Sequence, residues 1–227
     1  IRFVENHISR STISYKPLHP KFSEMYNRII AKLDGFLDLP SKTYKKYPSN
    51  ERSITGLYAR TIAKYMEGFL KTAILMGKKL TSLEPKNPYF LELRAQMLFE
   101  DGQVKNAMNL FQKCINILPN APLFRVGFAH AALELNEKDS VEKALVHLKE
   151  GLRIDQSLPL AWKLTAKAYN KLGKNGHSAL AIAEFNLLKG RRTLANSQAR
   201  RSLRLLKSGS PQWLRAQDIK NETSQLK

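Results

Sequence analysis

The chain has 227 residues, 43% of them apolar, so it can bury a substantial hydrophobic core. Lysine and arginine outnumber aspartate and glutamate by 38 to 19, a formal net charge of +19 that favours association with acidic partners. This composition excludes a disordered tail, and no apolar run approaches the roughly 18 residues that a membrane-spanning helix needs.

The start of the sequence, IRFVENHISR, has neither an initiating methionine nor the apolar core of a signal peptide. We therefore expect an excised fragment of a longer chain. The single cysteine, Cys114, excludes an internal disulfide and is expected to pack in the core.

From residue 22 onward the pattern of apolar residues is helical, and no segment alternates with the period of two that is typical of strands. Glycines and prolines divide this pattern into segments of about 12 to 16 residues, or about 18 to 24 Å of helix each. Such lengths are typical of solenoids built from helical hairpins. We therefore predict an all-α fold.

The stretch DGQVKNAMNLFQKCINILPN (101–120) has the spacing of one repeat unit. Its marks are Gly102, Ala107, Phe111 and Pro119. The same positions 34 residues earlier hold Gly68, Ala73, Gly77 and Pro85, so only the aromatic residue is lost. A repeated register of this kind predicts a repeat architecture.

A third unit opens at Pro122, with small residues at Ala129 and Ala144. These two alanines are three residues further apart than the repeat requires. We therefore predict that NEKDS (136–140) is a lengthened turn between helices.

A fourth unit and a last helical pair follow. The fourth unit opens at Pro159. Its aromatic marks are Trp162 and Tyr169, its small residue is Ala166 and its glycine is Gly173. The last pair, 177–190 and 191–207, has its marks at Ala183, Gly190 and Ala195.

The residue types explain how such units pack. Small residues let the two antiparallel helices of a hairpin approach closely, glycine permits the tight turn, and each unit buries its apolar face against the next. The pattern predicts a right-handed, tetratricopeptide-type solenoid of antiparallel helix hairpins.

Several segments also resemble the C-terminal region of bacterial zinc metalloproteases of the assembly-enhancing (BepA-like) type, and the resemblance covers about residues 22–221. The segments that carry it are RIIAKLDGFLDLP (28–40), KYPSNERSITGLYARTIAKYMEG (46–68), PKNPYFLELRAQMLFEDGQ (85–103), PNAPLFRVGFAHAAL (119–133) and SGSPQWLRAQDI (208–219). The first two segments, in which AKLDGFL leads to KYP, and the last segment are more specific signs of this family than the repeat marks are.

The resemblance implies four parts. These are a connector from a missing upstream domain (1–21), a degenerate first helical pair (22–53), a solenoid (54–209) and a C-terminal cap and tail (210–227). It further implies a missing peptidase domain that holds the zinc ion, a periplasmic or cell-envelope location, and partners in outer-membrane protein assembly.

The fragment itself has no HExxH motif, the helical histidine pair that binds zinc in such enzymes. Its five histidines are scattered, at His7, His19, His130, His147 and His177. His130 and Glu134 are one helical turn apart, but two groups cannot complete a tetrahedral site. We expect no catalytic centre, metal or cofactor in this fragment.

The first helices of successive hairpins line the concave face of a solenoid, where extended or helical peptides bind. The predicted groove residues are Tyr89, Glu92, Gln96, Phe99, Val126, His130, Leu133, Lys163, Lys167, Asn170 and Lys171. Three of them, Lys163, Lys167 and Asn170, are similar to part of the carboxylate-holding clamp of chaperone-binding tetratricopeptide domains, without the full set. A second basic face is predicted at Arg200, Arg204 and Lys207, opposite the stripe of Ala195, Ala199, Ser202 and Leu206.

The sequence thus favours a protein-binding repeat domain of an envelope metalloprotease that also contacts its own peptidase domain. A free-standing adaptor of the same fold is the alternative. Binding to nucleic acid is ranked below both, because the aromatic residues fall mostly at core positions of the repeats. Contact with an anionic membrane surface is ranked at a similar level.

Overall fold

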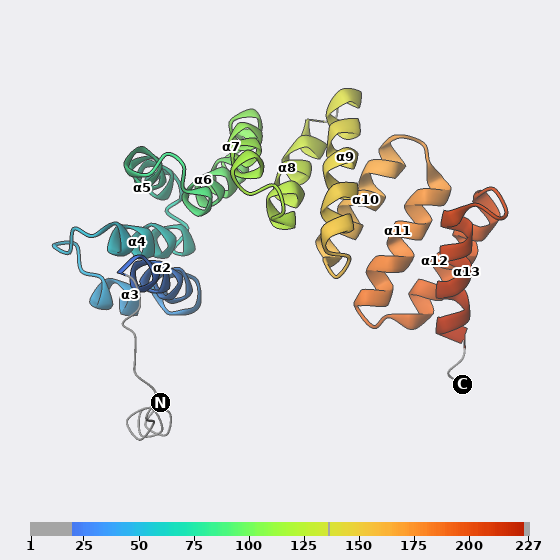
Figure 1. Cartoon of the computed structure of the whole chain (residues 1–227), viewed down its shortest axis with the longest axis horizontal. Helices are drawn as coiled ribbons and strands as arrows, with labels where there is room; N and C mark the ends of the chain where they lie inside the picture. The colour runs from blue at the N-terminus through green and yellow to red at the C-terminus, as the bar shows by residue number, and fades with distance from the viewer. Residues whose placement is uncertain (1–19, 136, 225–227) are drawn as a thin grey trace, which may run out of the picture. The chain divides into compact units, whose positions relative to one another are not determined.

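The computed structural model describes residues 20–135 and 137–224, and over these residues it contains helices and no strand, which confirms the all-α prediction. The chain divides into two compact units, one that ends at Met66 and one that begins at Glu67 (Figure 1). The first unit contains α2 (Pro20–Leu37), α3 (Pro40–Lys46) and α4 (Ile54–Met66). The second contains α5 (Leu70–Leu83), α6 (Pro88–Glu100), α7 (Val104–Ile117), α8 (Pro122–Glu134), α9 (Lys138–Ile154), α10 (Pro159–Lys171), α11 (Asn175–Leu188), α12 (Arg192–Leu205) and α13 (Pro211–Ser224).

In the first unit, α4 packs against both α2 and α3. Gly35 on α2 permits the close approach, because a Cβ added there would lie 2.7 Å from Cβ of Ile62 on α4. Residues 1–19 of the predicted connector lie outside the described residues. The boundary predicted at residue 54 stays a prediction, and α4 packs as part of the first unit.

An aspartate ties the end of α2 to α3 and to the residue that follows α3. The Asp34 carboxylate accepts hydrogen bonds of 2.7 Å from both Lys46 Nζ and Tyr47 Oη, and the Asp34 carbonyl accepts one from the Thr43 hydroxyl. Partial burial raises the pKa of Asp34, but the hydrogen bonds from Lys46 and Tyr47 outweigh it, so the pKa lies below its ordinary value. These contacts give the sequence pair AKLDGFL and KYP a structural role.

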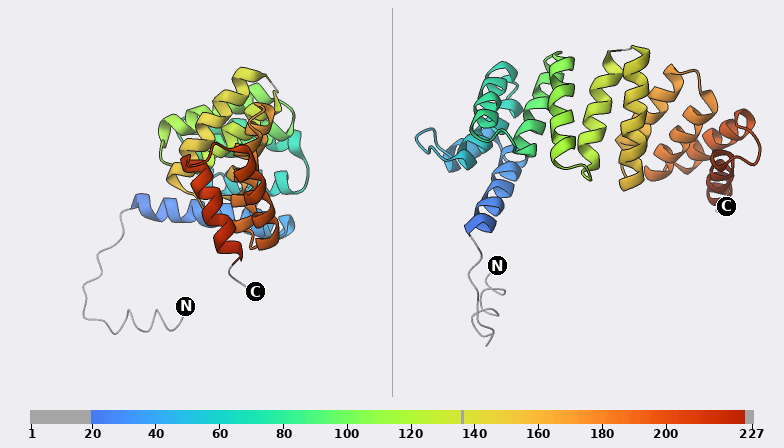
Figure 2. Two further views of the ribbon diagram at one scale, coloured as in Figure 1. Left: turned by 90° about the vertical axis from the view of Figure 1, so that its right-hand side faces the viewer. Right: turned by 45° about the horizontal axis from the view of Figure 1, so that its top comes forward.

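In the second unit, each helix packs against the next along the chain. The helices α6 and α7, α8 and α9, and α10 and α11 form antiparallel hairpins that lie side by side (Figure 1; Figure 2). The first helices of these hairpins also touch one another, since α8 contacts both α6 and α10. One face of the unit is therefore formed by first helices.

Glycine forms the turns between α6 and α7, between α10 and α11, and between α11 and α12. Gly102, Gly173 and Gly190 have φ of +78°, +70° and +68°, in the left-handed region that glycine adopts without strain. At each turn the N–H after the glycine donates to a carbonyl five residues back, as from Gln103 to Leu98, and the glycine N–H donates to a carbonyl three residues back. This Schellman arrangement satisfies carbonyls at the helix end.

Prolines begin the first helices of the hairpins. Pro88, Pro122 and Pro159 stand in the first turn, where the missing N–H removes no hydrogen bond. Asn87 caps α6, and its side-chain oxygen accepts from two backbone N–H groups of the first turn.

The small residues that define the predicted register are all buried. They are Ala73, Ala107, Ala129, Ala144, Ala166, Ala183 and Ala195, and none is more than 5% exposed. Gly77, which takes the place of the aromatic residue in its unit, is covered by Met97, whose Cε lies 2.7 Å from the position of an added Cβ. The repeat register is confirmed.

The lengthened turn predicted at NEKDS is wrong. α8 ends at Glu134 and α9 already begins at Lys138, an interval as short as those at the neighbouring hairpins. The extra residues lengthen the helix instead, because α9 has 17 residues where α7 and α11 have 14. Asn136 lies outside the described residues.

The C-terminal segment SGSPQWLRAQDI comprises the turn before α13 and the first residues of that helix, which packs on α12 and α11. Arg215 donates to both carboxylate oxygens of Glu184 at 2.6 and 2.8 Å, and the Trp213 indole donates to the Leu203 carbonyl. Ala216 and Ile219 are fully buried in a small core with residues of α11 and α12. The segment therefore caps the end of the helical array.

No described helix combines the length and the apolar character that crossing a bilayer requires.

Candidate functional site

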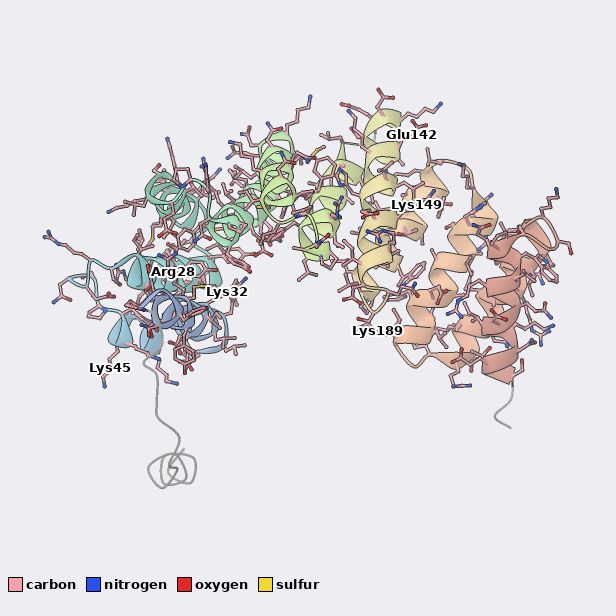
Figure 3. All side chains as sticks on the ribbon, viewed as in Figure 1. Arg28, Lys32, Lys45, Glu142, Lys149 and Lys189 are labelled. Atoms are coloured by element: carbon pink, nitrogen blue, oxygen red, sulfur yellow. The ribbon has the colours of Figure 1, made fainter. Side chains whose placement is uncertain are left out.

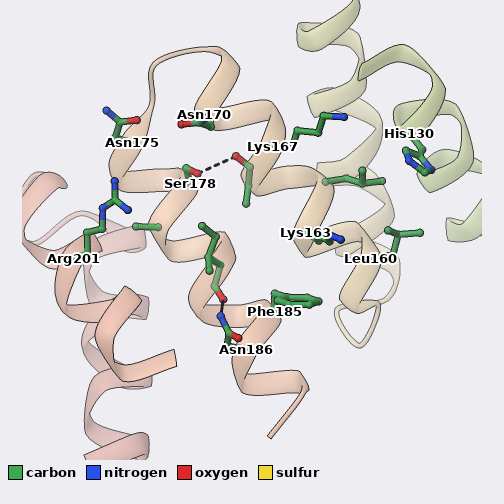
Figure 4. A pocket seen from close by; sticks show the side chains of 14 residues that line it. His130, Leu160, Lys163, Lys167, Asn170, Asn175, Ser178, Phe185, Asn186 and Arg201 are labelled. Atoms are coloured by element: carbon green, nitrogen blue, oxygen red, sulfur yellow. Dashed lines mark hydrogen bonds between the residues drawn. The ribbon is translucent and has the colours of Figure 1, made fainter. Parts of the chain in front are cut away.

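A cavity of about 660 Å³ opens among α8, α10, α11 and α12 (Figure 4). Its residues are basic, amide-bearing or apolar apart from one serine, and none is an aspartate or a glutamate. The lining consists of His130, Leu160, Lys163, Leu164, Ala166, Lys167, Asn170, Asn175, Ser178, Ala179, Ile182, Phe185, Asn186 and Arg201.

The cavity lies where the hydrophobic core is interrupted. One cluster of buried residues runs from α6 to α10, and a separate one joins α11, α12 and α13. Between them, Ser178 on α11 donates to the Ala166 carbonyl and Asn186 donates to the Ile182 carbonyl. The first bond joins α11 to α10, and the second lies within α11, so both of these polar side chains of the lining have partners.

Four of the predicted groove residues line this cavity: His130, Lys163, Lys167 and Asn170. The last three come from α10, whose start at Pro159 sets their helical face. Lys171 is exposed on the same helix but does not line the cavity.

The four predicted residues on α6 lie outside the cavity. Tyr89 is 50% exposed, with its ring at the edge of Phe124, and Glu92 is half-buried. Gln96 donates to Glu100 on its own helix, and the Phe99 ring packs 4.7 Å from that of His130. Phe99 therefore contacts a residue of the cavity lining without lining the cavity itself.

Val126 and Leu133, the other two predicted groove residues on α8, are buried. They are only 4% and 0% exposed, because α8 packs against α6, α7, α9 and α10 and uses most of its apolar side chains in the core. Of the predicted positions on α8, only His130 reaches the cavity.

Two charges in and beside the cavity compensate each other. Lys167 Nζ lies 2.6 Å from Oε1 of Glu134, and this hydrogen bond lowers the pKa of the Glu134 carboxyl. Burial lowers the pKa of His130. The negative charge of Glu134 raises this pKa, whereas the positive charges of Lys167 and Lys163 lower it further. His130 is therefore a neutral hydrogen-bonding group near pH 7.

The prediction missed the contribution of α11 and α12. Asn175, Ile182 and Phe185 come from α11, and Arg201 comes from α12. The signal that could have found them is the pair of turn glycines, Gly173 and Gly190, which makes α11 both the second helix of one hairpin and the first of the next.

The predicted second basic face is exposed on and just after α12. Arg200, Arg204 and Lys207 are exposed, and Arg200 donates to Asn196 one turn earlier. On the opposite side Ala195, Ala199 and Ser202 are buried, and Leu206 is half-buried. This face lines no part of the cavity.

The lone thiol, Cys114, is buried in the core, as the sequence predicts. Burial raises the pKa of Cys114 to about 12, and the thiol donates to the Pro88 carbonyl. Among the described residues no three histidine, cysteine, aspartate or glutamate side chains are grouped as a metal ion requires. His7 and His19 lie outside the described residues.

Comparison with known proteins places the fold. A family model described as "Anaphase-promoting complex, cyclosome, subunit 3" matches residues 66–151. A search of curated protein sequences found no match.

Several solved structures are similar to the chain. A MamA structure titled "MamA MSR-1 C2" is 14% identical with a TM-score of 0.59, over 74% of this chain and 95% of MamA. YrrB, titled "a TPR protein with an unusual peptide-binding site", is 14% identical with a TM-score of 0.60, over 77% of this chain and 90% of YrrB. A thermophilic TPR protein of Thermus thermophilus is 17% identical with a TM-score of 0.50, over 74% of this chain and 98% of the Thermus protein.

At these identities the similarity concerns the fold, and it agrees with the hairpins, turn glycines and buried alanines described above. The fold is of the tetratricopeptide type, in which α-helical hairpins stack as a solenoid.

Proposed function

We propose that the second unit is a protein-interaction domain that holds a segment of a partner in the cavity between α8 and α12. The observation that carries this proposal is the cavity itself, about 660 Å³ in volume, on the side where first helices of the hairpins meet. Repeat arrays hold peptides on this kind of face.

Site-specific photo-crosslinking tests this function. A photoreactive residue at Asn170, on the cavity wall, is expected to capture a defined partner in cells that express the full-length protein. The same residue at Glu142, exposed on α9 (Figure 3), is the control and is expected to capture none. Capture at Glu142 and not at Asn170 would refute a cavity-centred interaction.

We propose further that the domain belongs to a bacterial zinc metalloprotease of the cell envelope. The support is the resemblance of the segments around Asp34, Tyr47 and Trp213 to that family. On this proposal the zinc ion is bound by an upstream peptidase domain, the setting is periplasmic, and the partners belong to outer-membrane protein assembly.

The reading frame upstream of Ile1 tests this parentage. An HExxH motif in the same frame is the expected result. A frame that opens close to Ile1, or that lacks the motif, would leave the free-standing adaptor, which the cavity fits equally well.

A further inference from the structure

We propose that the cavity recognises acidic side chains of an extended protein segment, with Lys163 and Arg201 as the two carboxylate-binding residues. This inference rests on the proposed function and names the chemistry of the partner.

The first step is the balance of charge in the cavity. Lys163, Lys167 and Arg201 line it together, and no carboxylate does. Glu134 compensates Lys167 from the rim at 2.6 Å. Over the described residues neither Lys163 nor Arg201 forms an ion pair, and both side chains are exposed. Two cations are therefore available to a ligand.

The second step is the placement of these cations. Lys163 comes from α10, on the side of His130, whereas Arg201 comes from α12, on the side of Asn175 (Figure 4). Cations on different walls suit a ligand with at least two carboxylates better than a single chain-terminal carboxylate. Arginine can bind a carboxylate bidentately, and lysine acts as a point charge.

The third step concerns the rest of the lining, which favours a peptide over nucleic acid. Asn170 and Asn175 carry amides that can both donate to and accept from a peptide backbone. Leu160, Ile182 and Phe185 offer apolar contact. Phe185 is the one aromatic ring of this lining besides the His130 imidazole, whereas recognition of single strands uses successive stacking rings.

The remaining sequence of this chain is a poor candidate for the occupant. The residues before Pro20 include one acidic residue, Glu5, and several basic ones, and those after Ser224 include none that is acidic. An acidic segment must therefore come from another protein or from another part of a longer parent.

The experiment measures fluorescence anisotropy of a labelled peptide of alternating glutamate and alanine, titrated with the purified chain at about 50 mM salt. The same peptide with glutamine for glutamate is the reference, and a C-terminally amidated version separates side-chain from terminal carboxylates. We expect binding of the glutamate peptide, unchanged by amidation, and at least fivefold weaker binding of the glutamine peptide.

Variants assign the binding to the cavity. Lys163→Gln and Arg201→Gln are each expected to weaken binding by about 3 to 10-fold, because each removes one charged hydrogen-bond donor. The matched controls are Lys143→Gln on α9 and Arg191→Gln just before α12, which remove exposed charges outside the cavity and are expected to change binding less than twofold. All four sites are exposed, so circular dichroism is expected to show unchanged folding.

Equal binding of both peptides would overturn the inference, as would equal losses in the cavity and control variants. Tighter binding of a single-stranded oligonucleotide, lost in Lys163→Gln and Arg201→Gln, would also overturn it in favour of nucleic acid. The crosslinking at Asn170 does not depend on partner charge. A captured segment without acidic residues would therefore refute this inference and leave the proposed function intact.

Discussion

At the contacts between helices, the smallest residues decide how the chain can pack. The ring of Phe111 on α7 occupies the space beside Gly127 on α8, so that a Cβ added at Gly127 would lie 2.5 Å from its Cε1 atom. Gly151 on α9 also stands inside a helix and is buried, whereas Gly127 is half-buried, yet a Cβ at Gly151 would meet nothing closer than 3.6 Å. The two glycines therefore have different roles, although both stand inside helices.

This difference predicts opposite effects of the same substitution. Gly127→Ala is expected to lower the free energy of unfolding by about 1 to 3 kcal/mol, because the buried Phe111 ring cannot move away without strain. Gly151→Ala, the control, is expected to raise it by about 0.5 to 1 kcal/mol, since alanine favours helix over glycine. Urea unfolding of both variants is the measurement, and equal effects of the two would contradict the packing described.

His147 predicts a pH dependence of stability. Burial, and secondarily the charge of Arg125, lower the pKa of His147 in the folded chain, whereas the unfolded chain keeps the ordinary value near 6.5. As the pH falls through this value, the unfolded chain takes up a proton that the folded chain does not, so the folded state loses stability. The stability that His147 contributes in its neutral form is therefore complete above its pKa in the unfolded chain. It is lost as the pH falls toward its pKa in the folded chain.

The variant His147→Gln removes this titration. We expect it to lose less stability than the original chain between about pH 7.5 and about pH 5.5, measured by urea unfolding at both pH values. His130 and His177 titrate with lowered pKa in both proteins and act as a shared background. Identical losses in the two proteins would show that His147 contributes nothing to the pH dependence.

At the scale of the elements, the hairpins of the second unit could be predicted because their determinants are local. Turn glycines, prolines in the first turn and buried alanines recur at fixed spacing, and each acts through its own helix or the next. The start of α9 was misjudged because Lys138, Asp139 and Ser140 are polar residues that can begin a helix as well as extend a turn. Whether these three residues are helical depends on packing, and Ser140 is buried in the structure.

The C-terminal cap predicts a strong dependence on one ion pair. Arg215→Met is expected to lower the free energy of unfolding by about 1 to 2 kcal/mol, because the Glu184 carboxylate, 9% exposed, loses two charged hydrogen bonds while Arg215 itself is half-exposed. The double variant with Glu184→Gln is expected to recover part of this loss, because a neutral amide is cheaper to bury than an unpaired carboxylate.

The control for this prediction is Arg153→Met, which breaks the exposed pair with Glu150 on α9. It is expected to be close to neutral, because such pairs are screened by water. If Arg215→Met were as mild as Arg153→Met, the cap would not depend on Glu184.

At the scale of the whole molecule, the net charge of +19 is not concentrated in the cavity. Lys45 on α3, Lys149 on α9 and Lys189 after α11 lie on different elements (Figure 3). The charge can attract acidic molecules from a distance, but recognition requires the cavity, where cations, amides and apolar groups meet. The sequence predicted the α10 wall of this cavity because one helix carries it, and missed Arg201 because only the packing of α12 against α11 places it there.

Dispersed charge predicts weak, salt-sensitive binding of nucleic acid. Affinity for a mixed-sequence single-stranded oligonucleotide is expected to fall steeply from about 50 mM to about 150 mM salt and to become undetectable there, because it depends on release of counterions. Anisotropy titrations measure it. Sequence-selective binding that persists at the higher salt would contradict this expectation.

Amide hydrogen exchange of the chain with and without the partner captured at Asn170 tests the central claim most directly. The account predicts that the partner slows exchange in α10, α11 and the facing part of α12, the helices that supply most of the cavity wall. Protection confined to α9 or to α13, with none in α10, would show that the partner binds elsewhere and would contradict the account.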